Sequence, residues 1–436
     1  MVDLRLIREQ PDAFRAALRK KRADPRLVDR VLEVDRRRRE LVQDVEALRA
    51  AQNRASQEIP RLTGPAREER IAAMKRIAAQ AKAQEPALQA ADATLEALLL
   101  QIPNPPHPSV PDGGPEDSVT LRVVGAPPQF GFPPRDHVDL GAALDLLDVE
   151  RSAKVSGSRF YFLRRDGALL QLALIRYAVD RLGAEGFIPT IPPVLVKREN
   201  MIGMMGGIEL DEQMVYRIEG EDLALAGTSE MALGSMYLGE VLREADLPIR
   251  LCGVSTCFRR EAGAHGKDTR GMFRVHQFDK VEMFSYCHPD RSWEEHDYLL
   301  ALQERLWKDL GLPYRVVNIA AGDLGDPAAR KYDIETWMPG RGGYGETQSC
   351  SNCTDFQARR LNIRFRPSGG GGLGFVHTLN GTAVAGTRAI IAILENNQQA
   401  DGSVHIPRPL VPYMGGRTLL RPPSPPPSGT ESPLRE

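Results

Sequence analysis

The chain has 436 residues, 42% of them hydrophobic and 26% charged, which fits two or three globular domains and excludes a largely disordered protein. No run of about 18 uncharged apolar residues and no apolar leader is present, so we expect a cytoplasmic protein that does not span a membrane. The 57 Lys and Arg nearly balance 58 Asp and Glu, but residues 1–100 carry 21 basic against 16 acidic side chains. This surplus of five suggests a polyanionic partner, although a chance excess on a helical surface explains it equally well.

The N-terminal part is predicted to be helical. Residues 1–26 read as a short strand or turn followed by a helix. From residue 27 to 62, apolar side chains recur at alternating steps of four and three, and a matching series runs from 74 to 102. Thr63-Gly64-Pro65 between them is a turn signature. We therefore predict an N-terminal domain over 1–102 that carries an antiparallel α-helical coiled-coil arm over about 27–102. Pro86 predicts a kink or a break in the returning helix.

A second domain follows a Pro-rich linker at 103–120. Within 121–416, helical patterns at 168–181, 231–242, 292–310 and 387–396 alternate with extended segments at 187–196, 252–258 and 275–285. Several strands are adjacent without an intervening helix, so we favour an α+β fold with an antiparallel sheet flanked by helices. The segment 417–436 is rich in Pro and Ser and is predicted to be disordered.

Two segments of the second domain could bind a nucleotide. Gly369–Gly374 matches the pattern Gly-x-Gly-x-x-Gly, but an extended segment follows it, so a hairpin loop is the better interpretation. The pair of strands around Arg259 and Phe278 has side chains that are better suited to binding a nucleotide. An arginine at a strand end can hold a phosphate oxygen with two donors, and a neighbouring aromatic ring offers a face for a base. Alone, such a pair is also compatible with an ordinary surface hairpin.

The order of the motifs adds a resemblance to a known family. Gly186–Pro193, the hairpin from Phe258 to Glu282, and Gly381–Arg388 resemble, in order, the three signature motifs of class II aminoacyl-tRNA synthetases. Further segments resemble the seryl-tRNA synthetases of bacterial type: Lys154–Phe160, Gly227–Glu230, Cys257–Gly263, Thr347–Cys353, Asp355–Arg360 and His377–Thr382. The resemblance covers about residues 1–416. It implies a class II catalytic domain over 121–416 and an enzyme that activates L-serine with ATP and transfers it to serine tRNA, with selenocysteine tRNA as a further candidate.

The resemblance implies an ATP site. Arg259 looks like the catalytic arginine on the α-phosphate, and Arg388 like the one that holds the far phosphates. Attack of a carboxylate on phosphorus gathers negative charge, which fixed cations stabilise. The implied ATP-binding residues are Arg259, Arg260, Glu261, Val275, Phe278, Glu346, Thr347, Gln348, Ser349 and Arg388. Of these, Glu346 and Ser349 match the family's ligands for Mg²⁺ bound through ATP, and oxygen ligands suit that ion. Cys350 and Cys353 lack a second pair at metal spacing, so we expect no zinc.

The resemblance also implies an amino-acid site. Its serine-binding residues would be Thr228, Ser229, Glu230, Glu282, Asn380 and Thr382. Glu282 and Thr382 would face the serine hydroxyl, and a buried carboxylate that needs a donor discriminates against alanine. Ser229 stands where the family commonly has alanine.

For the N-terminal arm, the resemblance implies a tRNA-binding role across a homodimer. The candidate contacts are the basic residues Arg36, Arg37, Arg38, Arg39, Arg49, Arg54 and Lys75. The alternative for the arm is a coiled coil with a partner protein. Two alternatives remain for the whole chain: a synthetase relative that charges a carrier protein, which we would expect to lack the arm, and an RNA-binding module with a decayed site.

Overall fold

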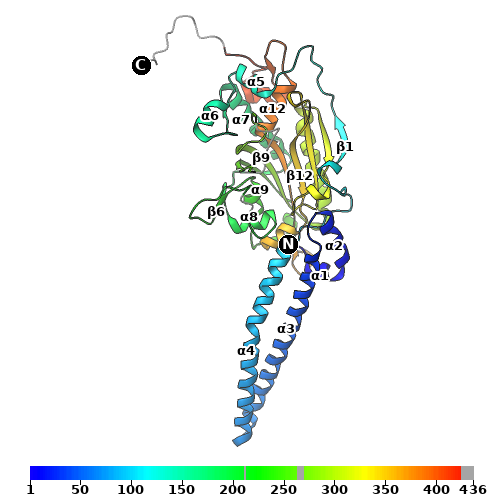
Figure 1. Ribbon diagram of the computed structural model, residues 1–436, viewed down its shortest axis with the longest axis vertical. Helices are drawn as coiled ribbons and strands as arrows, with labels where there is room; N and C mark the ends of the chain where they lie inside the picture. The colour runs from blue at the N-terminus through cyan, green and yellow to red at the C-terminus, as the bar shows by residue number, and fades with distance from the viewer. Residues whose placement is uncertain (211–212, 263–269, 424–436) are drawn as a thin grey trace, which may run out of the picture. The chain divides into compact units, whose positions relative to one another are not determined.

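The computed structural model describes residues 1–210, 213–262 and 270–423 (Figure 1). It divides into two compact units. The first comprises Met1–Pro105 and the three residues Gly206–Ile208, and the second comprises the rest. The division after Pro105 falls within the segment 103–120 that the sequence analysis interprets as a linker.

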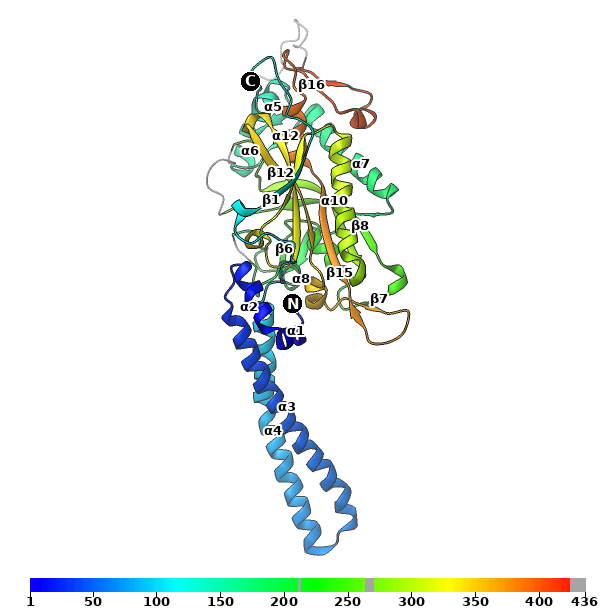
Figure 2. The same ribbon diagram turned by 90° about the vertical axis from the view of Figure 1, so that its right-hand side faces the viewer.

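The regular secondary structure of the first unit is helical. Its helices are α1 (Leu4–Glu9), α2 (Pro11–Lys20), α3 (Arg26–Glu58) and α4 (Gly64–Leu100), with a short 3-10 turn at Ile59–Arg61. The two long helices lie side by side in both views (Figures 1 and 2). The chain reverses at the predicted turn, where Gly64 has a φ of 58°, a conformation that glycine adopts easily. The strand considered for the first residues is wrong, because Asp3 caps α1 by accepting a hydrogen bond from the Arg5 amide at 2.8 Å.

Helix α4 continues through Pro86, so a break there is wrong. Proline removes the hydrogen bond to the carbonyl four residues earlier, which belongs to Lys82. Both Pro86 and Lys82 are exposed, and water can therefore hydrogen-bond to that carbonyl. The exposed position explains why the helix tolerates this proline.

The second unit is built on an eight-stranded sheet. Its strands, in spatial order, are β1 (Val119–Val124), β10 (Tyr314–Asn318), β11 (Arg330–Met338), β12 (Gly343–Asn352), β15 (His377–Ala385), β9 (Gln277–Cys287), β8 (Ile249–Phe258) and β4 (Ile188–Thr190). All neighbouring strands are antiparallel except β4 and β8, which are parallel. The prediction of an antiparallel sheet is confirmed.

Helices accompany this sheet. They are α5 (His137–Ala143), α6 (Val149–Ser156), α7 (Arg165–Ala184), α8 (Arg198–Met205), α9 (Glu230–Gly234), α10 (Ser292–Asp309), α11 (Phe356–Leu361) and α12 (Gly386–Asn396). Figure 2 shows α10 running along the sheet, where it packs against β12 and β15. Apolar side chains from α7, α10, α12 and the sheet form the main core, in which Trp307 and Tyr314 are fully buried. No helix in the described ranges combines the length and the apolar character that crossing a membrane requires.

Short strands complete the unit. They pair as β2 (Leu147–Asp148) with β3 (Phe162–Leu163), β5 (Leu195–Lys197) with β6 (Leu223–Leu225), β13 (Arg364–Arg366) with β7 (Val241–Arg243) and β14 (Gly374–Phe375), and β16 (Val404–His405) with β17 (Leu419–Leu420). The predicted hairpin at the glycine run is confirmed, since β13 and β14 flank it and Gly370 and Gly371 have φ of 80° and 108°.

Two predictions differ from the structure in this unit. The helix predicted over 231–242 is only the five-residue α9, and β7 begins before that segment ends. Disorder over 417–436 is wrong for Leu419–Leu420, which form β17 because their backbone pairs with β16 and Leu420 is fully buried. Residues 424–436 of that segment lie outside the described residues.

Candidate active site

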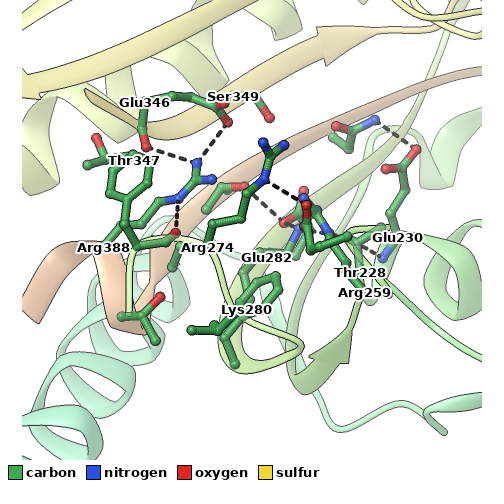
Figure 3. Close-up of a pocket in the computed structure, with 18 residues that line it drawn as sticks. Thr228, Glu230, Arg259, Arg274, Lys280, Glu282, Glu346, Thr347, Ser349 and Arg388 are labelled. Carbon is green, nitrogen blue, oxygen red and sulfur yellow. Dashed lines mark hydrogen bonds and ion pairs between the residues drawn. The ribbon is translucent and has the colours of Figure 1, made fainter. Parts of the chain in front are cut away.

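A cleft of about 670 Å³, including its open mouth, lies over the central strands of the sheet (Figure 3). Side chains from the start of α9, from the segments that follow β8 and precede β9, from β9, β12 and β15, and from the first turn of α12 converge on it. The cleft is lined by Thr228, Glu230, Arg259, Glu261, Phe273, Arg274, Val275, Phe278, Lys280, Glu282, Glu346, Thr347, Ser349, Asn380, Thr382, Ala385, Thr387 and Arg388.

A bulge in β12 brings two of these side chains to the same face of the strand. Glu346 pairs with Glu335 and Gln348 with Ile334, so Thr347 is an extra residue without an opposite partner. An extra residue shifts the alternation of side chains by one position. Glu346 and Ser349, three positions apart, consequently both line the cleft.

A second bulge lies in β15. Thr382 pairs with Glu282 and Val384 with Val281, which leaves Ala383 as the extra residue. Thr382 and Ala385 therefore share the cleft face. The buried Gln348 donates a hydrogen bond from Nε2 to the carbonyl oxygen of Ala383 at 2.7 Å, and so links the two bulges.

Two arginines supply positive charge to the cleft (Figure 3). Arg259 follows the end of β8, donates from Nε to the carbonyl oxygen of Gly227 at 3.1 Å, and has its guanidinium carbon 5.3 Å from the centre of the Phe278 ring. Arg388 lies in the first turn of α12, and its Nη1 is 3.2 Å from Glu346 Oε1. It also donates to the carbonyl oxygen of Phe273 at 3.3 Å. These contacts fix the direction of both guanidinium groups.

Buried carboxylates occupy the other part of the cleft. Glu282 is only 2% exposed and forms an ion pair with Lys280 through Oε2, which also accepts a hydrogen bond from Thr382 Oγ1 at 3.3 Å. Lys280 Nζ donates to Thr228 Oγ1 at 2.7 Å. A single lysine thus contacts two of the predicted amino-acid-binding residues.

Glu230, which is partly buried, is the second carboxylate. It accepts hydrogen bonds from Asn380 Nδ2 at 3.0 Å and Gln357 Nε2 at 2.9 Å. Burial, followed by the negative charge of Glu282, raises the pKa of Glu230 to about 7. This group therefore changes its charge close to neutral pH.

The carboxylate of Glu346 is kept ionised by its neighbours. Burial acts to raise the pKa of Glu346, but the positive charge of Arg388, with smaller effects of Lys331 and Arg259, lowers it below its usual value. Asp333, opposite Ser349 on β11, behaves in the other way: burial and the nearby Glu346 charge raise its pKa to about 8. An ionised carboxylate beside the Ser349 hydroxyl offers two oxygen ligands of the kind that Mg²⁺ prefers.

Within the described residues, no group of three or more His, Cys, Asp or Glu is arranged to hold a metal ion. A divalent cation at Glu346 and Ser349 would therefore need further oxygens, and a bound triphosphate can supply them.

Cys350 and Cys353 are both buried, and burial raises the pKa of the Cys350 thiol.

The structure brings together thirteen of the residues that the sequence analysis assigns to ATP or serine. They are Thr228, Glu230, Arg259, Glu261, Val275, Phe278, Glu282, Glu346, Thr347, Ser349, Asn380, Thr382 and Arg388.

Three of the assigned residues do not line the cleft. Arg260 is exposed, and its amide donates to the carbonyl oxygen of Met214 at 3.0 Å. Gln348 points away because of the β12 bulge. Ser229 is 1% exposed and packs beside Gly253, where a methyl group would come within 2.8 Å of its Oγ. Its hydroxyl has no hydrogen-bond partner within the described ranges.

Five residues of the cleft were missed by the sequence analysis: Phe273, Arg274, Lys280, Ala385 and Thr387. Lys280 could have been found, because Phe278, Lys280 and Glu282 alternate along β9 and so share one face. Arg274, whose Nε lies 2.7 Å from Glu261 Oε2, precedes that strand in a segment without a periodic signal.

The basic residues predicted to bind tRNA lie on α3 and α4. Four of them pair with acidic residues: Arg37 with Glu40, Arg38 with Asp92, Arg39 with Asp35, and Arg49 with Glu85. Arg36, Arg54 and Lys75 are exposed, and no ion pair engages them in the described part of the chain. Of the seven basic residues, these three are therefore the most available for contact with a polyanion.

Comparison with known proteins covers both units. Residues 1–106 match the model of the seryl-tRNA synthetase N-terminal domain, and residues 214–397 match the tRNA synthetase class II core domain (G, H, P, S and T). A serine–tRNA ligase of Nocardia farcinica is 49% identical over 424 residues, which cover 97% of this chain and 100% of the relative. The chain belongs to the seryl-tRNA synthetase family. A second family member, from Thermobifida fusca, is 50% identical over 96% of this chain and 99% of its own.

A solved structure of the family agrees with this assignment. The crystal structure of seryl-tRNA synthetase from Pyrococcus horikoshii complexed with ATP matches with a TM-score of 0.93 and 42% identity, over 97% of this chain and 100% of that chain. The prolyl-tRNA synthetase of Giardia lamblia, at 18% identity and a TM-score of 0.55, shares only the fold.

The buried pair Lys280 and Glu282 gives a stability prediction. Replacing Lys280 by Met leaves the Glu282 carboxylate buried without its cation, and we expect a loss of about 3–5 kcal/mol in the free energy of unfolding. The double variant Lys280→Met/Glu282→Gln should recover most of it, because no uncompensated charge remains. Urea unfolding of the three proteins measures both effects. A Lys280→Met variant as stable as the wild type would contradict the pairing.

Proposed function

We infer that this chain is an ATP-dependent ligase that joins L-serine to tRNA. In the first step the serine carboxylate attacks the α-phosphorus of ATP, a carboxylate–phosphorus bond forms, and pyrophosphate leaves. In the second step a hydroxyl of the terminal tRNA ribose attacks the carbonyl carbon of seryl-adenylate, and AMP leaves. The observation that carries this inference is that one cleft holds both cations and carboxylates: Arg259 and Arg388 over one part, and Glu230 and Glu282 in the other.

In the ATP half, Arg259 would hold the α-phosphate and Phe278 would stack on adenine. The Arg259 guanidinium already lies over the ring at 5.3 Å, which is consistent with a base and a phosphate entering side by side. Arg388 would hold the far phosphates, and Glu261 would accept from the adenine amino group. No side chain needs to remove a proton in this step, because the serine carboxylate is already ionised.

In the serine half, Glu282 and Thr382 would recognise the hydroxyl. Glu282 Oε2 is already occupied by Lys280 and Thr382, so the serine hydroxyl would donate to the other carboxylate oxygen. Alanine would leave this buried acceptor without its donor, at a cost of about 1–3 kcal/mol. Glu230, with Thr228 beside it, would bind the α-amino group, and Asn380 keeps the Glu230 carboxylate in place.

Mg²⁺ is part of this proposal. Glu346 and Ser349 would hold it together with the phosphates, and the ion would neutralise part of the triphosphate charge. The lowered pKa of Glu346 supports this choice of ligand, whereas the raised pKa of the buried Asp333 disfavours that carboxyl as a ligand.

Serine tRNA, a second copy of the chain and a cytoplasmic location complete the proposal. The basic residues of α3 and α4, with Arg36, Arg54 and Lys75 foremost, would contact the RNA backbone. Homodimer formation is supported by apolar side chains at the edge strand β4 and after it, since Ile188 is 55% and Ile191 is 87% exposed. The alternative of a carrier-charging relative is disfavoured, because the paired α3 and α4 helices are intact.

Exchange of pyrophosphate into ATP tests the proposed activation step directly. With each of the twenty amino acids in turn, we expect serine alone to support rapid exchange, because only serine combines a small side chain with a hydroxyl donor for Glu282. In Glu282→Ala, serine-dependent exchange should be lost while ATP binding, measured by calorimetry, is retained. Exchange that is supported equally by alanine, or unaffected in Glu282→Ala, would contradict the proposal.

The raised pKa of Glu230 predicts a pH dependence. Glu230 must be ionised to bind the serine ammonium group, and it becomes ionised as the pH rises through about 7. The kcat/KM for serine should therefore fall about tenfold per pH unit below that value, because this parameter reports the free enzyme. The kcat/KM for ATP serves as the internal control. A serine profile that is flat between about pH 6 and pH 8 would rule out Glu230 as the titrating group.

The arm gives a separate prediction. In the triple variant Arg36→Glu/Arg54→Glu/Lys75→Glu, kcat/KM for tRNA in serine transfer should fall by about tenfold or more, since three phosphate-binding charges are reversed. Serine-dependent pyrophosphate exchange should not change. The two assays on the same preparation give the comparison. Equal loss of both activities, or unchanged transfer, would contradict a tRNA-binding role for these residues.

A further inference from the structure

The backbone pairing between β12 and β15 ends below the cleft. Strands β12 and β15 pair at only three positions, and the last pair towards the cleft is Cys350 with Gly381. The next residues on each strand, Ser349 and Thr382, line the cleft, and no ladder pair joins them. On its other side β15 stays paired with β9 as far as Ala385 and Lys280. No backbone pairing therefore fixes the distance between β12 and β15 at the cleft, where the Gln348 side chain on the Ala383 carbonyl oxygen is one link between them.

A side chain from another element spans this gap. Gln303 of α10 is fully buried and donates from Nε2 to the carbonyl oxygen of Ser349 at 2.8 Å and to that of Thr382 at 2.8 Å. One amide group thus binds one backbone oxygen of each separated strand. In doing so it satisfies two carbonyl groups that the interrupted ladder leaves available.

Gln303 reaches these carbonyls from the face of the sheet opposite the cleft. Side chains alternate along a strand, and Asn380 and Thr382, on either side of Gly381, both line the cleft. A methyl group at Gly381 would point to the other face, where it would lie 3.3 Å from Gln303 Nε2. Gln303 consequently cannot touch a ligand in the cleft, and any effect it has on the reaction must act through the two strands.

We propose that Gln303 is a positioning residue of the reaction, which fixes the spacing between β12 and β15 and so holds Thr382 in register with Ser349. This inference rests on the proposed function, in which Thr382 faces the serine hydroxyl and Ser349 faces the metal and phosphates. Serine is held on the β15 side of the cleft, and the metal and phosphates are held in part on the β12 side. A change in their separation misaligns the reacting atoms, and a displacement of about 1 Å can cost about a hundredfold in rate.

The chemistry of the amide explains why glutamine suits this position. Its NH₂ group carries two donors, one for each carbonyl. Methionine has a similar length and no donor, so Gln303→Met removes both hydrogen bonds with little change in volume. Asparagine keeps the two donors on a side chain that is one methylene shorter, so Gln303→Asn retains the polarity but not the reach.

The chain offers a matched control in Gln398. It is 3% exposed, does not line the cleft, and also donates from Nε2 to two backbone oxygens, those of Arg135 at 3.0 Å and Glu395 at 2.8 Å. Gln398→Met therefore removes two donated hydrogen bonds, as Gln303→Met does, and in addition the one that Gln398 Oε1 accepts from the Arg135 amide at 2.8 Å. The general cost of a lost buried amide should appear in both variants, whereas a positioning effect should appear only at Gln303.

The test compares the full-length wild type with Gln303→Met, Gln303→Asn and Gln398→Met. Thermal unfolding gives Tm, and pyrophosphate exchange over a grid of serine and ATP concentrations gives kcat and both KM values. We expect Tm to fall similarly in Gln303→Met and Gln398→Met. We expect kcat to fall at least about tenfold in both Gln303 variants, with the KM of ATP nearly unchanged, and to stay within about twofold of the wild type in Gln398→Met. Gln303→Asn keeps the test decisive if Gln303→Met does not fold.

Two outcomes would overturn the inference. One is that both Gln303 variants keep kcat within about twofold of the wild type. The other is that Gln398→Met loses as much kcat as Gln303→Met, which would make the effect a general loss of stability. A wild-type protein without serine-dependent exchange would instead overturn the proposed function, so the two failures are distinguishable.

Discussion

The active-site cleft depends on an interrupted ladder between two neighbouring strands. A regular sheet with β12 and β15 fully paired would present a flat floor whose side chains alternate strictly. Here the pairing stops at Cys350 and Gly381, and both strands carry a bulge just beyond that point. The bulges turn Glu346 and Ser349, and likewise Thr382, towards the cleft. Side-chain amides, rather than backbone hydrogen bonds, then join the strands.

A second constraint is the negative charge of the two glutamates that this arrangement brings into one cleft. Glu230 and Glu282 both line the cleft, and the negative charge of Glu282 adds to the burial that raises the pKa of Glu230. Lys280 compensates Glu282 directly, whereas Glu230 accepts hydrogen bonds from the uncharged amides of Asn380 and Gln357. Of the two carboxylates, Glu282 thereby has a cation in direct contact. The other is kept easily neutralised until a cationic amino group arrives, which makes the empty site less costly to fold.

The sequence predicts most of the architecture because its strongest signals are local. The periodic apolar positions of the arm, the turn at Gly64, and the mixed helices and strands of the second domain all depend on residues close in the chain. The errors come from tertiary contacts: Leu419–Leu420 are ordered by pairing with β16, and the exposed position of Pro86 lets α4 continue.

Within the site, the motifs identify residues that are brought into one cleft, including Arg259, Glu282 and Arg388. They do not identify Gln348 as pointing away, because a bulge leaves no mark on the alternation that can be read from the sequence. They also miss Arg274 and Gln303. Arg274 lies within the hairpin motif but in a stretch without a periodic signal, and Gln303 lies outside the motifs, so their places at the site arise only when the elements pack together.

The most direct test of the whole account is a crystal structure of the protein with Mg²⁺ and a non-hydrolysable sulfamoyl analogue of seryl-adenylate. The account predicts that the seryl hydroxyl lies within hydrogen-bonding distance of Glu282 and Thr382, the ammonium group at Glu230, and the sulfamoyl group at Arg259, with adenine against Phe278. An analogue bound elsewhere, or bound in the cleft with its hydroxyl away from Glu282, would contradict it.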